Sequence, residues 1–166
     1  MSEINPSEFR RALGRFATGV TIITTRDQAG TPVGITANSF NSVSLDPPMV
    51  LWSLARTANS LEAFMTCDHF AVHILAAHQI DLSNKFASRG IDKFAGQAVT
   101  SGLGGVPLLD DYATRFQCRT LQRHDGGDHI IFVGEVLDFS EQDAPPLLFH
   151  GGSYASLGPS PAAPQS

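Results

Sequence analysis

The fold of this chain is most constrained by a polar segment that lies between two strand-like apolar runs. Residues 34–48 read Gly-Ile-Thr-Ala-Asn-Ser-Phe-Asn-Ser-Val-Ser-Leu-Asp-Pro-Pro, and residues 49–54 then resume a buried strand. The Asp-Pro-Pro sequence stops a helix and turns the chain at a fixed φ. Small and hydroxylated side chains offer many hydrogen-bonding groups with little bulk, and the flanking strands give rigid support. The segment therefore indicates a site for a planar ligand; an ordinary hairpin with Ser and Asn in its turn is the alternative.

Composition places the chain among globular, single-domain proteins. It has 166 residues, of which 42% are hydrophobic, enough for one buried core. The net charge of −5 argues against a nucleic-acid partner, and no apolar run reaches the length of a membrane span. The N-terminal sequence lacks the features of a signal peptide. We therefore expect a cytoplasmic protein without a nucleic-acid or membrane partner, in which Cys67 and Cys118 are buried, reduced thiols.

The chain opens with signals for a helix. Asn5 is suited to cap it, Pro6 suits its first position, and Ile4 pairs with Phe9 as a hydrophobic staple. Gly19 is expected to end the helix. One face carries the apolar side chains of Phe9, Leu13, Phe16 and Ala17. We therefore predict that this helix packs on the body of the domain.

Apolar and β-branched runs between turn signals predict a set of antiparallel strands. These strands are expected at residues 20–25, 31–36, 49–54, 70–75, 113–123, 129–139, 147–150 and 154–157. Short helices are expected at residues 79–86 and at residues 58–65, the latter with Leu61, Phe64 and Met65 facing inward. Residues 88–108 contain many glycines and no clear periodicity, so we predict a long irregular excursion. The Pro- and Ser-rich tail, residues 158–166, is predicted to be disordered.

This order of elements predicts a mainly β fold, a β-barrel decorated by helices, in one domain that spans residues 1–157. It argues against a Rossmann fold. The glycine-rich candidate, residues 102–105, follows no strand and opens no helix, so it does not place a pyrophosphate on a helix N-terminus. His69 and His73 lack the further ligands that a metal site needs, and we expect no metal.

Three further features carry possible chemistry. In residues 53–60, hydroxyls, Arg56 and free helix N–H groups are suited to hold a phosphate; a helix cap at Thr57 beside a solvated arginine is the alternative. His129 follows a tight Gly-Asp turn and projects from fixed backbone, although a lone histidine in a turn is often a surface residue. Tyr154 follows a glycine pair that presents its aromatic side chain near the C-terminus. The alternative is that Tyr154 lies in the core or at a dimer interface.

Taken together, these features resemble the flavin reductase-like family. The resemblance rests on the order Thr-Gly-Val-Thr-Ile at residues 18–22, the polar segment at 34–48, Phe-Ala-Val-His-Ile-Leu at 70–75, Gly-Asp-His at 127–129 and Gly-Ser-Tyr at 152–154. Members are small NAD(P)H:flavin oxidoreductases that supply reduced flavin to two-component monooxygenases. The resemblance implies an FMN-binding split β-barrel that works as a homodimer, with the flavin near the subunit interface.

The resemblance also implies site residues. Those implied to line the isoalloxazine ring are Thr36, Ala37, Asn38 and Ser39. Those implied to contact the ring edge and ribityl chain are Ser42, Val43 and Ser44. Those implied at the phosphate end are Ser53, Ala55, Arg56 and Thr57. A further family segment approaching the flavin corresponds to Lys85, Phe86 and Ala87. On the nicotinamide side the resemblance implies His129, as the catalytic residue, and Tyr154.

The chemistry of such a reaction fits the residue types. A hydride moves between the nicotinamide and the flavin, so the cofactor makes the bond and the protein stacks and orients the rings. No general base is needed, which agrees with a segment rich in Ser, Thr and Asn rather than in paired carboxylates. The alternatives are an FMN-binding electron carrier or sensor without turnover, and a split barrel that binds haem or another substrate. The choices between FMN and FAD, and between NADH and NADPH, stay open.

Overall fold

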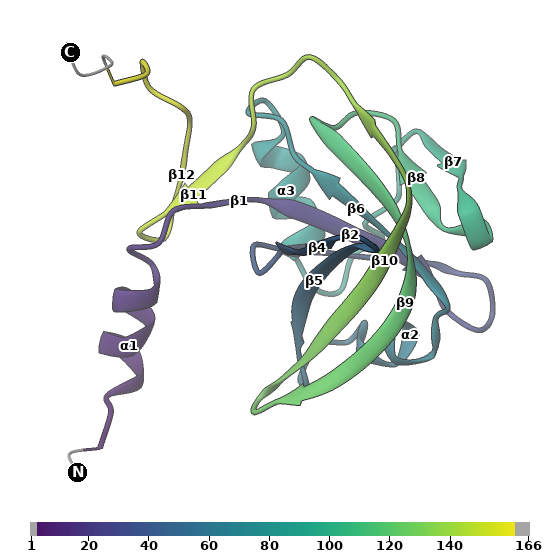
Figure 1. Ribbon diagram of the computed structural model, residues 1–166, viewed down its shortest axis with the longest axis horizontal. Coiled ribbons are helices and arrows are strands. Elements are labelled where there is room, and N and C mark those ends of the chain that lie inside the picture. Colours follow the sequence, from purple (N-terminus) through teal and green to yellow (C-terminus); the bar gives the residue numbers. More distant parts are fainter. Residues whose placement is uncertain (1–2, 162–166) are drawn as a thin grey trace.

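A seven-stranded antiparallel sheet forms the body of the protein (Figure 1). The computed structural model describes residues 3–161, and the strand order of this sheet is β3-β2-β6-β9-β10-β5-β4. Its strands are β2 (Thr21–Arg26), β3 (Pro32–Ala37), β4 (Asn41–Leu45), β5 (Pro48–Ala55), β6 (His69–Ile74), β9 (Thr114–Gly126) and β10 (His129–Glu141). The predicted mainly β architecture is confirmed.

The polar segment connects the two edges of this sheet. β3 and β4 lie at opposite ends of the strand order, yet only residues 38–40 separate them along the chain. A chain step spans at most about 3.8 Å, so the end of β3 and the start of β4 lie within about 15 Å of each other. The sheet therefore curves toward a barrel that is split between β3 and β4.

Smaller elements surround the curved sheet. One small sheet contains β1 (Thr18–Gly19), β11 (Leu148–His150) and β12 (Ser153–Ala155), and another contains β7 (Val99–Ser101) and β8 (Pro107–Leu109). The helical elements are α1 (Pro6–Leu13), α2 (Leu61–Thr66), α3 (Ile80–Ala87) and the 3₁₀ turn η1 (Leu103–Gly105). All the predicted strands and the two predicted internal helices occur, with shifts of a few residues at their ends, whereas β1, β4, β7 and β8 are strands that the sequence does not predict.

The core of the curved sheet is aromatic. β5 alternates between the two faces of the sheet, and this places Val50, Trp52 and Leu54 inside. Trp52 stacks on Phe132 with ring centroids 4.7 Å apart, and it meets Phe64 edge-on at 4.8 Å. Large aromatic rings such as these bury much apolar area and contribute strongly to the stability of a core.

A buried histidine joins three strands beside this core. The Leu109 N–H donates to Nε2 of His73 over 3.0 Å. The other nitrogen, Nδ1, therefore carries the proton, and it donates to the Ile22 carbonyl over 3.1 Å. His73 is fully buried. Burial lowers the pKa of His73 to about 3, so the side chain is neutral in the folded protein.

The prediction of a wholly irregular excursion at residues 88–108 is wrong in part. Its second half contains η1 and the pair β7–β8, in which Val99 faces Leu109. Contacts from a distant strand hold this hairpin: the Thr24 hydroxyl donates to the Pro107 carbonyl over 2.6 Å, and Nε of Arg26 donates to the Gly105 carbonyl. Local sequence does not indicate contacts between residues so far apart in the chain, which explains why β7 and β8 were not predicted.

The N-terminal helix begins as predicted but does not pack as predicted. Oδ1 of Asn5 accepts the Ser7 and Glu8 N–H groups over 3.0 and 3.3 Å. The helix ends at Leu13 rather than near Gly19, which belongs to β1. It buries none of its residues, and its apolar face stays exposed at Phe9, Leu13, Phe16 and Ala17. Figure 1 shows why the helix is exposed. The chain joins the body of the protein at β1, which pairs with β11, and α1, which precedes β1, projects away from the sheet.

Other expectations have mixed outcomes. Phe64 is buried as predicted, but Met65 is 40% exposed because α2 turns Ala63 and Phe64 inward instead. Both cysteines are buried free thiols, as predicted, and burial raises the pKa of Cys118 to about 12.

Of the tail, residues 158–161 are exposed without helix or strand, and residues 162–166 lie outside the described residues. No helix in the described part of the chain is long and apolar enough to cross a membrane.

Candidate functional site

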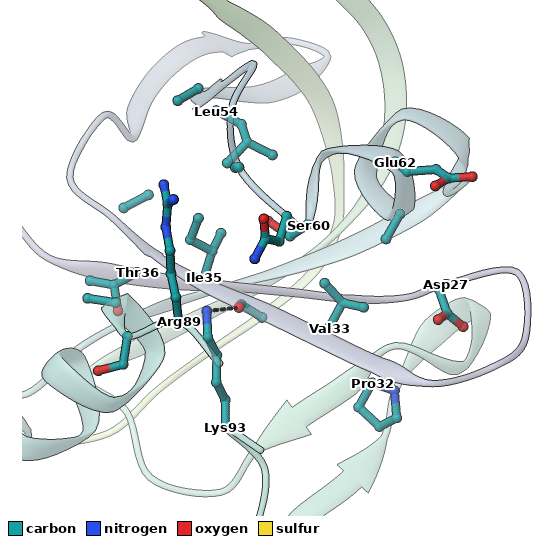
Figure 2. A pocket seen from close by; sticks show the side chains of 18 of the residues that line it. Asp27, Pro32, Val33, Ile35, Thr36, Leu54, Ser60, Glu62, Arg89 and Lys93 are labelled. Atoms are coloured by element: carbon teal, nitrogen blue, oxygen red, sulfur yellow. Dashed lines mark hydrogen bonds between the residues drawn. The ribbon is translucent and has the colours of Figure 1, made fainter. Parts of the chain in front are cut away.

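A cavity of about 1010 Å³ opens beside the segment that joins the two sheet edges (Figure 2). One wall is β3 with the residues that follow it, a second is the end of β5 with the start of α2, and a third is the segment after α3. The predicted site residues that line this cavity are Thr36, Ala37, Asn38, Ser39, Ser53, Ala55, Ala87 and His129. The structure thus brings together residues that are up to 93 positions apart, from Thr36 to His129.

The hydroxyl groups of this cavity hold the wall together. The Ser39 hydroxyl accepts the Ser53 N–H over 2.9 Å and donates to the Ser53 carbonyl over 3.0 Å, so it ties the polar segment to β5. The Thr36 hydroxyl donates to the Ser83 carbonyl over 2.6 Å and ties β3 to α3. These side chains fix the shape of the cavity, while the exposed amide of Asn38 remains available for a ligand.

Several predicted residues lie outside the cavity lining. Ser42, Val43 and Ser44 are on the edge strand β4. Phe86 is fully buried behind β3, where a Cβ at position 34 would lie only 2.5 Å from its ring. Gly34 therefore permits the close approach of α3 to the cavity wall. The Lys85 ammonium donates to the Ala95 carbonyl, and neither residue lines the cavity.

Arg56 and Thr57 also lie outside the lining, and Arg56 supports the turn between β9 and β10. Its Nε donates to the Gly127 carbonyl over 2.9 Å, and its guanidinium pairs with Asp125. The Arg56 N–H donates to the Asp128 carbonyl, also over 2.9 Å. The side chain that the sequence associates with a phosphate thus orients the turn that carries His129.

His129 reaches the cavity because β10 pairs with β5. The register places it opposite Ala55, and both line the cavity. Its Nδ1 lies 2.7 Å from Oδ1 of Asp128. This hydrogen bond lowers the pKa of the Asp128 carboxyl. The pairing holds the imidazole in one orientation at the cavity edge.

Tyr154 lies among the smaller elements rather than at the cavity. Its hydroxyl donates to Oδ1 of Asn84 over 2.8 Å and lies 2.8 Å from the Ser83 hydroxyl. Its ring meets Phe149 edge-on at 5.5 Å. Through α3, Tyr154 supports the same wall as Thr36.

Sequence reasoning missed two cationic residues of the cavity, Arg89 and Lys93, which lie in the segment predicted to be irregular. The Lys93 ammonium donates to the Gly34 carbonyl over 3.1 Å and to the Phe86 carbonyl over 2.7 Å. Burial, and then the neighbouring charge of Arg89, lower the pKa of Lys93. The signal in the sequence is a pair of cationic residues within a long, glycine-containing loop, because long loops in compact domains often carry functional residues. In the described part of the chain, no three His, Cys, Asp or Glu side chains converge to hold a metal ion.

The curved, split sheet places the chain in the class of split-barrel proteins, and comparisons with known proteins identify the family. Residues 13–158 match the model of the flavin reductase like domain. The chain is 46% identical over 150 residues to the FMN reductase (NADH) SmoA of Agrobacterium fabrum, covering 90% of this chain and 85% of that protein. The chain belongs to the flavin reductase-like family.

Other relatives agree with this assignment. The chain is 41% identical over 162 residues to HsaB of Rhodococcus jostii, the reductase subunit of a flavin-dependent monooxygenase, covering 97% of this chain and 83% of HsaB. The structure of the NADH:FAD oxidoreductase SgcE6 of Streptomyces globisporus, in complex with NAD and FAD fragments, matches with a TM-score of 0.87 and 34% identity over 96% of this chain and 98% of that one. The chain spans about half the length of two longer relatives.

The residues of the cavity fit a flavin. Small side chains leave room on its walls for a flat ring system, at Ala37, Ala55, Ala58 and Ala87. The amides of Asn38 and Asn59 and the cations of Arg89 and Lys93 provide hydrogen-bond donors around that space. A cavity of about 1010 Å³ is at the upper end of the range for small-molecule sites.

Proposed function

We propose that this protein is an NADH:flavin oxidoreductase that supplies reduced flavin to a separate oxygenase. The observation that carries the proposal is the cavity between β3 and β5, with its small side chains and hydrogen-bond donors, in a chain of the flavin reductase-like family. Relatives named as an FMN reductase (NADH) and as the reductase subunit of a flavin-dependent monooxygenase support both parts of the proposal.

The protein's own task in this reaction is to position two rings. Bound flavin supplies the redox chemistry by accepting a hydride from the nicotinamide. The Ser39 and Thr36 hydroxyls fix the wall against which a ring lies, because each bonds backbone of a neighbouring element. Ordered walls reduce the entropic cost of bringing the two rings together. Ala37 and Ala55 keep the ring faces accessible.

His129 is proposed to contact the nicotinamide or the carbonyl edge of the flavin. Its imidazole lies at the cavity, and Asp128 holds Nδ1, which leaves Nε2 for a ligand. As an imidazolium, in which both ring nitrogens donate, this side chain would stabilise negative charge as it develops on the reduced ring. The remaining residues implied by the family resemblance, on β4 and in residues 56–57, 85–86 and 154, stay proposals as ligand contacts.

The active form is proposed to be a homodimer. An eight-residue helix is marginal in water without tertiary packing, yet α1 buries none of its residues in its own chain. Phe9 and Leu13 are 53% and 59% exposed, and Phe16 is 79% exposed. A second copy of the chain, paired through this same exposed apolar face, is the proposed partner, since most soluble oligomers are symmetric homodimers.

Steady-state assay of the purified protein tests the function. The loss of NADH absorbance is followed with FMN or FAD as acceptor and repeated with NADPH, without any oxygenase present. Oxidation of NADH that depends on flavin is expected, and the relative rates assign the flavin and the nicotinamide. Tight flavin binding without oxidation above background in any combination would instead favour an FMN-binding electron carrier.

A further inference from the structure

Arg89 and Lys93 place two positive charges on one wall of the cavity. Both follow α3 and both line the cavity. Figure 2 shows Arg89 extending past Ile35 and Thr36 of β3, with Lys93 bonded to the backbone of the same strand. The charge of Arg89 contributes to lowering the pKa of Lys93, so the two cations lie within electrostatic range of each other.

The protein itself does not neutralise this pair. Within residues 3–161, none of the ion pairs includes either side chain. The carboxylates that line the cavity belong to Asp27, Glu62 and Asp92. Oδ1 of Asp27 accepts the Ala29 and Thr31 N–H groups, and Oδ1 of Asp92 accepts the Phe94 and Ala95 N–H groups. In Figure 2, Asp27 and Glu62 lie at the other end of the cavity from Arg89.

The two side chains keep donors free for a ligand. The Lys93 ammonium has three N–H donors, and two of them are used by the Gly34 and Phe86 carbonyls. The Arg89 guanidinium donates no hydrogen bond within the described residues, so its N–H groups are available to bind a ligand. A guanidinium fork and an ammonium together match the oxygens of a phosphate group.

We propose that Arg89 and Lys93 bind a phosphate group of a nucleotide held in the cavity. The nature of that nucleotide, a flavin or a nicotinamide dinucleotide, rests on the proposed function. Arg56 is the phosphate residue that sequence reasoning favours, but its guanidinium is engaged by the β9–β10 turn. Arg89 and Lys93 thus provide the positive charge inside the cavity that Arg56 does not.

The experiment compares ligands with and without phosphate on the Arg89→Gln variant. Binding of FMN and riboflavin is followed by flavin fluorescence, and binding of NADH and reduced nicotinamide riboside by nicotinamide fluorescence. Loss of a charge-assisted contact weakens binding by about tenfold or more. A weaker affinity for FMN with unchanged riboflavin affinity assigns the pair to the flavin phosphate. A weaker affinity for NADH with unchanged riboside affinity assigns it to the dinucleotide.

Matched variants separate a phosphate contact from loss of structure. Arg119→Gln, on β9 and outside the cavity lining, removes the same charge and is expected to change neither affinity. Arg89→Lys is expected to recover part of the lost affinity, and Lys93→Gln to repeat the pattern. Equal weakening of phosphate-bearing and phosphate-free ligands, or no change for any ligand, overturns the proposal. Neither titration requires turnover, so they still decide the matter if wild-type protein fails to oxidise NADH and the proposed function fails.

Discussion

His73 makes a strong prediction about acid stability. Burial lowers its pKa from 6.5 to about 3, whereas in the unfolded chain the imidazole titrates near 6.5. The unfolded chain therefore binds more protons between these two values, and the free energy of unfolding falls as the pH falls below 6.5. The full difference corresponds to about 5 kcal/mol, of which about 2 kcal/mol is already lost at about pH 5.

The assay is urea unfolding at a series of pH values and at fixed protein concentration. The fluorescence of Trp52, the single tryptophan, reports on the buried core. The control is His73→Gln, because an amide can donate to the Ile22 carbonyl and accept the Leu109 N–H without titrating. We expect the free energy of unfolding of the wild type to fall more steeply between about pH 7 and 5, by about 2 kcal/mol.

Other acidic and histidine side chains also change stability in this range, but they are common to both proteins. The difference between the two pH profiles therefore isolates His73. Parallel profiles for wild type and His73→Gln would refute the reasoning, because they would mean that residue 73 binds no additional proton on unfolding. A changed m-value would point instead to altered compactness of one state.

Four further predictions concern the cavity and the exposed helix. His129→Ala is expected to change the free energy of unfolding by less than about 1 kcal/mol, since the side chain is partly exposed, while lowering kcat or raising the KM for NADH; unchanged kinetics would remove it from the site. Leu13→Ser should halve the mass measured by light scattering in dilute solution if α1 packs on a second copy. Gly34→Val forces Phe86 to move and should cost about 1–3 kcal/mol in thermal unfolding, against a neutral effect of Gly158→Val, where an added Cβ meets no atom within 4 Å. Ser39→Ala removes both bonds to Ser53 and should weaken FMN binding by about tenfold in fluorescence titration, with Ser39→Thr as the conservative control.

Local sequence determined most of the secondary structure. The cap at Asn5 sets where α1 begins, and the alternation of apolar residues along β5 sets which face is buried. These signals act over two to four residues, so they are readable without knowledge of the fold. The polar segment also lies where the structure has a cavity, since Thr36 to Ser39 line it.

Only the tertiary structure decided which polar side chains face a ligand. The Ser39 and Thr36 hydroxyls are consumed by contacts 14 and 47 residues away, and Arg56 bonds a carbonyl 71 residues further along the chain. Lys93 reaches the cavity through a bond to Gly34, at a separation of 59 residues. Hydrogen-bond partners at such separations depend on how strands from across the chain pair and curve, and this information is not contained in any local pattern. For the same reason, local sequence predicted the apolar face of α1 but not that the fold leaves this face exposed.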